Sequence, residues 1–170
     1  MPKRILWALL FILVAALLQS TILSRLTDYI FAIPDIALCI LVYVAYLNGT
    51  MSGQLTGFSS GLMLDFLSAS PLGLNALVRT LIGACVGFFK ATFFLDFFFF
   101  PMALCAGATV FKALVFFLLH LLFPDAVPTY SLLSLTLWIE LGLNTLLAPF
   151  IFAFLKLFSS LLVLGPRENY

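Results

Sequence analysis

Only 9% of the 170 residues are charged and 64% are hydrophobic, and the formal net charge is +1. A soluble domain of this length carries charge on roughly a quarter of its positions, so the composition excludes a domain surrounded by water. The sequence shows no basic patch, which argues against a nucleic-acid partner.

The apolar runs predict an all-α membrane protein, a bundle of about six transmembrane helices in a single domain over residues 1–170. A helix needs roughly 20 residues to cross a hydrocarbon core about 30 Å thick. Membrane β-barrels would instead show alternating hydrophobicity. In chain order, the expected spans are approximately Ile5–Leu23, Pro34–Leu47, Met51–Leu67, Leu74–Phe89, Phe97–Leu122 and Leu132–Leu155.

Lys3 and Arg4 precede the first apolar run, as basic residues precede the apolar region of a signal peptide. No convincing small-residue cleavage site follows this run, however. We therefore expect an uncleaved helix. Pro34 suits a helix N-terminus, and Pro149 is expected to kink the sixth span.

The basic residues near the span ends predict that both termini lie on the cytoplasmic side of the membrane. Six spans place five of them on the side of the termini, namely Lys3, Arg4, Lys90, Lys156 and Arg167, and only Arg25 opposite. If the fourth segment does not cross, five spans are the alternative.

Glycines recur every four residues in the third span, at Gly49, Gly53, Gly57 and Gly61, and Asp65 continues the series. Such a ridge without side chains lets a second helix backbone approach closely. The fourth span has the same spacing in Asn75, Arg79, Gly83 and Gly87, so the two spans are predicted to form a tightly packed antiparallel hairpin.

Charged residues within spans are costly unless they are paired. We expect Asp65 to pair with Arg79 across the hairpin, and Lys112 to pair with Glu140 between the fifth and sixth spans, with Asn144 one turn from Glu140. Such pairs either hold helices together or line a substrate path, and the structural role is favoured here.

Phenylalanines crowd the start of the fifth span, at Phe93, Phe94, Phe97, Phe98, Phe99 and Phe100. Contact with membrane lipid is the simpler interpretation, and a docking surface for a partner helix is the alternative.

Catalytic chemistry is not apparent. His120 is the single histidine, at a span end, and Cys39, Cys85 and Cys105 lie in separate apolar runs. We find no nucleotide, metal or hydrolase motif, so no enzymatic activity, metal or cofactor is predicted.

The middle third resembles the MreD family of bacterial rod-shape-determining membrane proteins. The matching positions are Pro34, Asp35, Gly53, Gly57, Gly61, Asp65, Pro71, Gly73 and Asn75. The resemblance implies a fold similar to the six-helix substrate-binding subunit of energy-coupling-factor transporters. It also implies a non-enzymatic scaffold for cell elongation, which binds MreC and supports lateral peptidoglycan synthesis with MreB, RodA and its penicillin-binding transpeptidase.

The alternative function is that of a substrate-binding subunit of a vitamin-type transporter. Such subunits usually dock their partner through alanines four apart on the first helix, whereas here Ile12 follows Ala8 and Gln19 follows Ala15. An intramembrane hydrolase is a third, weaker alternative. The sequence leaves open which surface binds MreC, whether the chain self-associates and whether it encloses a cavity.

Overall fold

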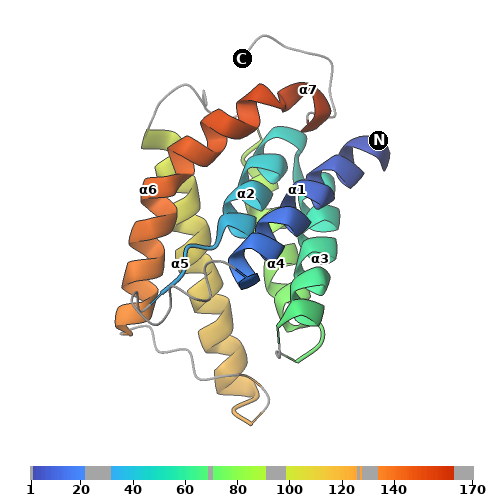
Figure 1. The fold of residues 1–170 in the computed structure, drawn as a ribbon. Coiled ribbons are helices and arrows are strands. Elements are labelled where there is room, and N and C mark those ends of the chain that lie inside the picture. The colour runs from blue at the N-terminus through green and yellow to red at the C-terminus, as the bar shows by residue number, and fades with distance from the viewer. Residues whose placement is uncertain are drawn as a thin grey trace.

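The computed structural model describes residues 2–21, 32–68, 71–90, 99–125, 127 and 134–162, and every regular element in these ranges is a helix (Figure 1). The helices are α1 (Pro2–Thr21), α2 (Ile36–Asn48), α3 (Thr50–Leu67), α4 (Leu74–Phe88), α5 (Phe99–Leu122), α6 (Leu135–Leu157) and the short α7 (Ser159–Leu162). The order predicted from the apolar runs is confirmed, and most helix ends differ from the predicted ones by one to three residues.

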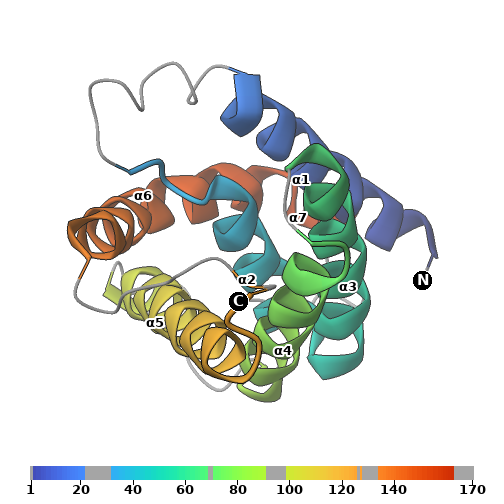
Figure 2. The same cartoon turned by 90° about the horizontal axis from the view of Figure 1, so that it is seen from below.

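Helix α2 occupies the centre of the bundle. Figure 2 shows α1, α3, α4, α5 and α6 arranged around it, and each of these helices contacts it. All ten residues from Ala37 to Tyr46 are buried. Because protein surrounds α2 on every side, the helix is apolar on every face. Its 13 residues extend only about 20 Å, less than a hydrocarbon core.

The helices differ in their capacity to cross a bilayer. Two of those described, α5 and α6, are long and apolar enough, with 24 and 23 residues. The apolar part of α1 (Ile5–Gln19), α2 and α4 are shorter. Helix α1 buries Ala8, Ile12 and Ala15 against the bundle and exposes Leu6 and Leu10 on its other side. The number of spans therefore stays a prediction.

Helices α3 and α4 form the predicted hairpin, and their glycines bring the two backbones into contact. A Cβ atom added to Gly53 would overlap the carbonyl oxygen of Gly83, and one added to Gly57 would overlap that of Arg79. Gly61 meets Ala76 in the same way. These contacts replace the side-chain packing of ordinary helix pairs and give the close approach expected of small residues every four positions.

Two features shape the ends and the course of the helices. Gly49 alone separates α2 from α3, and its φ of +87° is accessible to glycine and strained for other residues. Helix α6 contains Pro149 and visibly changes direction in its second half (Figure 1), as its proline predicts.

Substituting Gly57 by alanine is expected to destabilise the hairpin by about 1–3 kcal/mol, because the new methyl group meets the rigid backbone at Arg79. The free energy of unfolding in mixed micelles measures this. Gly107→Ala is the matched control, since a Cβ there meets nothing within 4 Å, and it is expected to leave stability unchanged or slightly raised. Equal effects of the two substitutions would contradict the close approach.

Candidate functional site

The bundle interior contains a group of interacting polar side chains, which we call the Asp35 cluster. Its members come from four parts of the chain and are Asp35, Arg79, Lys112, Glu140 and Asn144. Three ion pairs join described residues to one another, and all three lie within this cluster.

Asp35 lies at the centre of this cluster because the chain enters α2 here. Its Oδ1 caps α2 by accepting the Leu38 N–H at 3.0 Å, and it also accepts Nη2 of Arg79 at 2.7 Å. Its Oδ2 accepts Nζ of Lys112 at 3.0 Å. The Asp35 backbone N–H donates to Oδ1 of Asn144 at 2.7 Å, so one residue joins the start of α2 to α4, α5 and α6.

Lys112 and Glu140 form the ion pair that the sequence predicts, with Nζ of Lys112 2.6 Å from Oε1 of Glu140. Lys112 therefore bridges two carboxylates. Asn144, one turn beyond Glu140, donates from Nδ2 to Oγ1 of Thr109 at 3.0 Å and adds a second link between α5 and α6. The predicted face of α6, with Glu140 and Asn144 together, is thus turned into the cluster.

The charges of the cluster balance, with two cations and two carboxylates. Side-chain exposure is 5% for Arg79 and 7% for Asp35, and 17% and 11% for Lys112 and Glu140. Removing one partner of a buried ion pair leaves an uncompensated charge and typically costs about 3–5 kcal/mol. Because Nη1 of Arg79 is buried without a hydrogen-bond partner in the described structure, this guanidinium depends chiefly on Asp35.

The predicted Asp65–Arg79 pair is wrong. The glycine contacts set a register in which Arg79 lies level with Gly57, two turns along α3 from Asp65. Arg79 turns to Asp35 instead, while Asp65 lies beside the turn that joins the two helices.

Asp65 caps the N-terminus of α4. Its carboxylate accepts the backbone N–H groups of Gly73, Asn75 and Ala76 at 2.9, 3.0 and 3.2 Å, and also Nδ2 of Asn75 at 2.9 Å. A negative charge is favourable at a helix N-terminus, where these N–H groups have no intrahelical acceptor. The carboxylate therefore has a structural role in the hairpin turn.

The remaining family-motif positions surround these two carboxylates. Pro34 precedes Asp35, and its carbonyl accepts the Ile36 N–H at 3.1 Å. The Pro71 carbonyl accepts the Leu74 N–H at 3.2 Å, and Gly73 opens α4 with a φ of +94°. The motif thus marks the two places where a helix begins at a buried acidic side chain.

The phenylalanine-rich stretch is only partly described. Phe97 and Phe98 lie outside the described residues. Phe99 is exposed, whereas Phe100 packs its ring against Tyr46 of α2 with centroids 5.2 Å apart. Of the proposed partner surface, therefore, one of the two described residues faces outward and the other packs within the bundle.

The geometry does not suggest a reaction centre. Among the described residues, no group of three or more histidine, cysteine or acidic side chains is arranged to hold a metal ion. Cys39 and Cys105 are buried and Cys85 is exposed, all as free thiols. The Asp35 cluster instead links helices through side chains that pair with one another.

Every regular element that the structure describes is a helix, and the apolar composition and the charge-balanced interior are those of a membrane protein. The family model of the rod shape-determining protein MreD matches residues 2–158, and the chain therefore belongs to the MreD family. The family is one of bacterial membrane proteins that determine cell shape, and it is not a known enzyme family. No curated protein and no solved structure matched the chain.

Replacing Asp65 by alanine is expected to destabilise the protein by about 2 kcal/mol, because three backbone N–H groups of α4 lose their acceptor. Hydrogen exchange should then accelerate at the Gly73, Asn75 and Ala76 amides. Asp65→Asn keeps one acceptor oxygen and should give a smaller change. Unaltered exchange at these three amides in the alanine variant would contradict the capping role.

Proposed function

We propose that this chain is a non-enzymatic scaffold of the cell-elongation machinery. It binds the membrane helix and juxtamembrane region of MreC and thereby supports lateral peptidoglycan synthesis and rod shape. MreB, RodA and its penicillin-binding transpeptidase are indirect partners. The family match over residues 2–158 is the observation that carries this proposal.

The distribution of polar groups supports a binding role within the membrane. The described intramembrane charges form internal contacts, namely those of the Asp35 cluster and the cap of α4. The outer surface carries large exposed apolar side chains, such as Trp7 on α1, Val110 on α5 and Trp138 on α6. Partner proteins therefore meet this chain through apolar helix faces or through its short loops.

We further propose six membrane crossings with both termini in the cytoplasm. The start of α1 and the short α7 lie at the same end of the bundle and the two helices contact each other (Figure 1). An even number of crossings puts both ends of a chain on one side of a membrane, so this arrangement supports six rather than five. The excess of basic residues on that side favours the cytoplasm.

Depletion of the protein from its rod-shaped host should produce rounded cells, and the tagged protein should co-purify with MreC in mild detergent. The variant Lys112→Met/Glu140→Gln removes one positive and one negative charge and leaves Asp35 paired with Arg79. Because a balanced removal avoids an unpaired charge, the folded protein should accumulate, restore rods and retain MreC.

Three outcomes would contradict this proposal. Normal rods after depletion would exclude a role in shape. A folded, MreC-bound double variant that leaves cells round would show that Lys112 and Glu140 do more than hold helices together, as would a small molecule that co-purifies at one equivalent only with the unaltered protein.

A further inference from the structure

Two buried cysteines meet at the contact between α2 and α5. Cys39 of α2 and Cys105 of α5 are each 1% exposed, and a side-chain hydrogen bond joins their thiols. A thiol is a weak donor and a weak acceptor, so this bond by itself adds little to stability. It shows instead that the two sulfur atoms point toward each other across the helix pair.

Contacts on either side of the two thiols fix the register of α2 and α5. Lys112 of α5 pairs with Asp35 at one end, with Nζ 3.0 Å from Oδ2. Tyr46 of α2 packs against Phe100 at the other end, with ring centroids 5.2 Å apart. Residue numbers therefore rise along α2 while they fall along α5, and on each helix the cysteine lies between these two contacts. The antiparallel register thus places the thiols opposite each other.

The geometry of this pair suits a disulfide. Two cysteines can be bridged without movement of the backbone only where their side chains already point toward each other. The Cys39 N–H donates to the Asp35 carbonyl, so the pair lies one helical turn from the Asp35 cluster. We propose that Cys39 and Cys105 form a reversible disulfide, which joins α2 to α5 covalently and acts as a redox-dependent lock on the bundle.

The burial of both thiols determines the kind of oxidant that can act on them. We assign this role to a small, membrane-permeant two-electron acceptor, because the thiols lie in the apolar interior. Two S–H bonds break and one S–S bond forms, while the acceptor takes up two electrons and two protons. Helices α3 and α4 lie in the loop that the new bond closes, so the bond constrains the unfolded chain and makes the oxidised protein harder to unfold.

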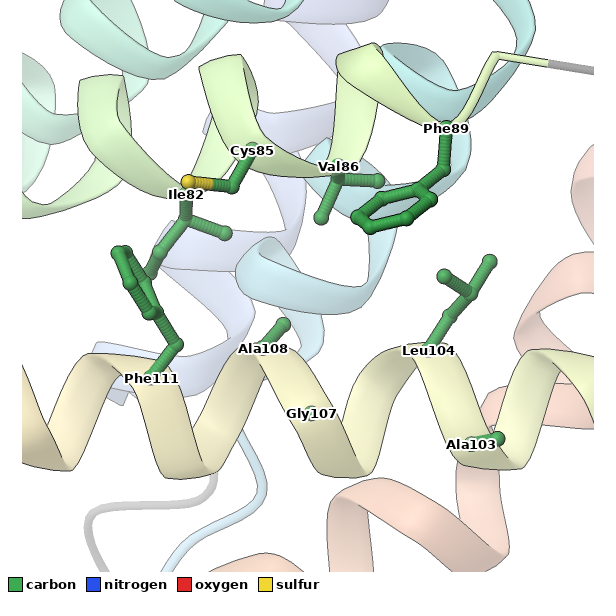
Figure 3. Close-up of a pocket in the computed structure, with 9 residues that line it drawn as sticks. All are labelled: Ile82, Cys85, Val86, Phe89, Ala103, Leu104, Gly107, Ala108 and Phe111. Atoms are coloured by element: carbon green, nitrogen blue, oxygen red, sulfur yellow. The ribbon is translucent and has the colours of Figure 1, made fainter.

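Cys85 is an internal control, because it lies apart from this pair. It is exposed and lines an apolar pocket between α4 and α5, which Leu104 and Ala108 line from α5 (Figure 3). Helix α5 therefore presents these two side chains to the pocket beside Cys85 and presents Cys105 to α2.

Counting free thiols tests the proposal on the purified full chain in mild detergent. The folded protein is treated with the azo oxidant diamide, freed of it, unfolded in sodium dodecyl sulfate and labelled with N-ethylmaleimide, and intact mass gives the number of labels. Untreated protein should take up a label on each of its three cysteines. Oxidised protein should take up one, on Cys85, and dithiothreitol should restore all three.

The matched variants Cys39→Ala and Cys105→Ala separate a disulfide from oxidation of single thiols. Each variant should keep both of its remaining labels after diamide, because the buried thiol that is left has lost its partner. Three labels on the oxidised unaltered protein would overturn the proposal. Loss of the remaining buried thiol in either variant, to the same extent as in the unaltered protein, would also overturn it.

Unfolding in mixed micelles tests the lock itself. Oxidation should raise the fraction of dodecyl sulfate needed to unfold the unaltered protein and should leave that of the two alanine variants unchanged. The same midpoint for the oxidised and reduced forms of the unaltered protein would contradict a lock. These measurements use the isolated chain, so their outcome is independent of whether it binds MreC.

Discussion

A single carboxylate, that of Asp35, pairs with two cations in the interior of this bundle, and the arrangement of four helices depends on it. Asp35 accepts hydrogen bonds from Arg79 of α4 and Lys112 of α5, while its backbone N–H is held by Asn144 of α6. Lipid provides little hydrophobic drive for helices to associate, because acyl chains are as apolar as the side chains that face them. Directional interactions therefore carry more of the specificity. Glu140 completes the balance of charge, which lowers the free-energy cost of burying these side chains in an apolar environment.

Close backbone packing supplies the second source of cohesion, and it acts on a different part of the bundle. The glycines of α3 bring its backbone against α4, and this register decides which charges can meet. With Arg79 level with Gly57, its side chain is directed toward α2, and Asp65 is left at the turn to cap α4. Glycine packing thus places Arg79 within reach of Asp35, so the two sources of cohesion are coupled.

Much of this architecture could be predicted from local patterns. The apolar runs define the helices, the four-residue spacing defines the α3–α4 hairpin, and comparable depth predicts the Lys112–Glu140 pair. The Asp35–Arg79 pair could not be predicted, because it joins residues 44 positions apart on helices whose order around α2 the sequence does not encode locally. The only available signal was an acidic residue after Pro34 at the start of an apolar run. A comparison of depth alone pairs Arg79 with Asp65, because it does not include the glycine contacts that set the register between α3 and α4.

A double-mutant cycle on Asp35 and Arg79 tests the central claim most directly, with the free energy of unfolding in mixed micelles as the measured quantity. Asp35→Asn should destabilise the protein by about 3–5 kcal/mol, because it leaves an excess positive charge buried. Adding Arg79→Met restores the balance and should recover most of that loss, while Asp125→Asn at an exposed position should change stability by less than about 0.5 kcal/mol. Additive losses from the two substitutions, or no loss from Asp35→Asn alone, would contradict a bundle organised around this carboxylate.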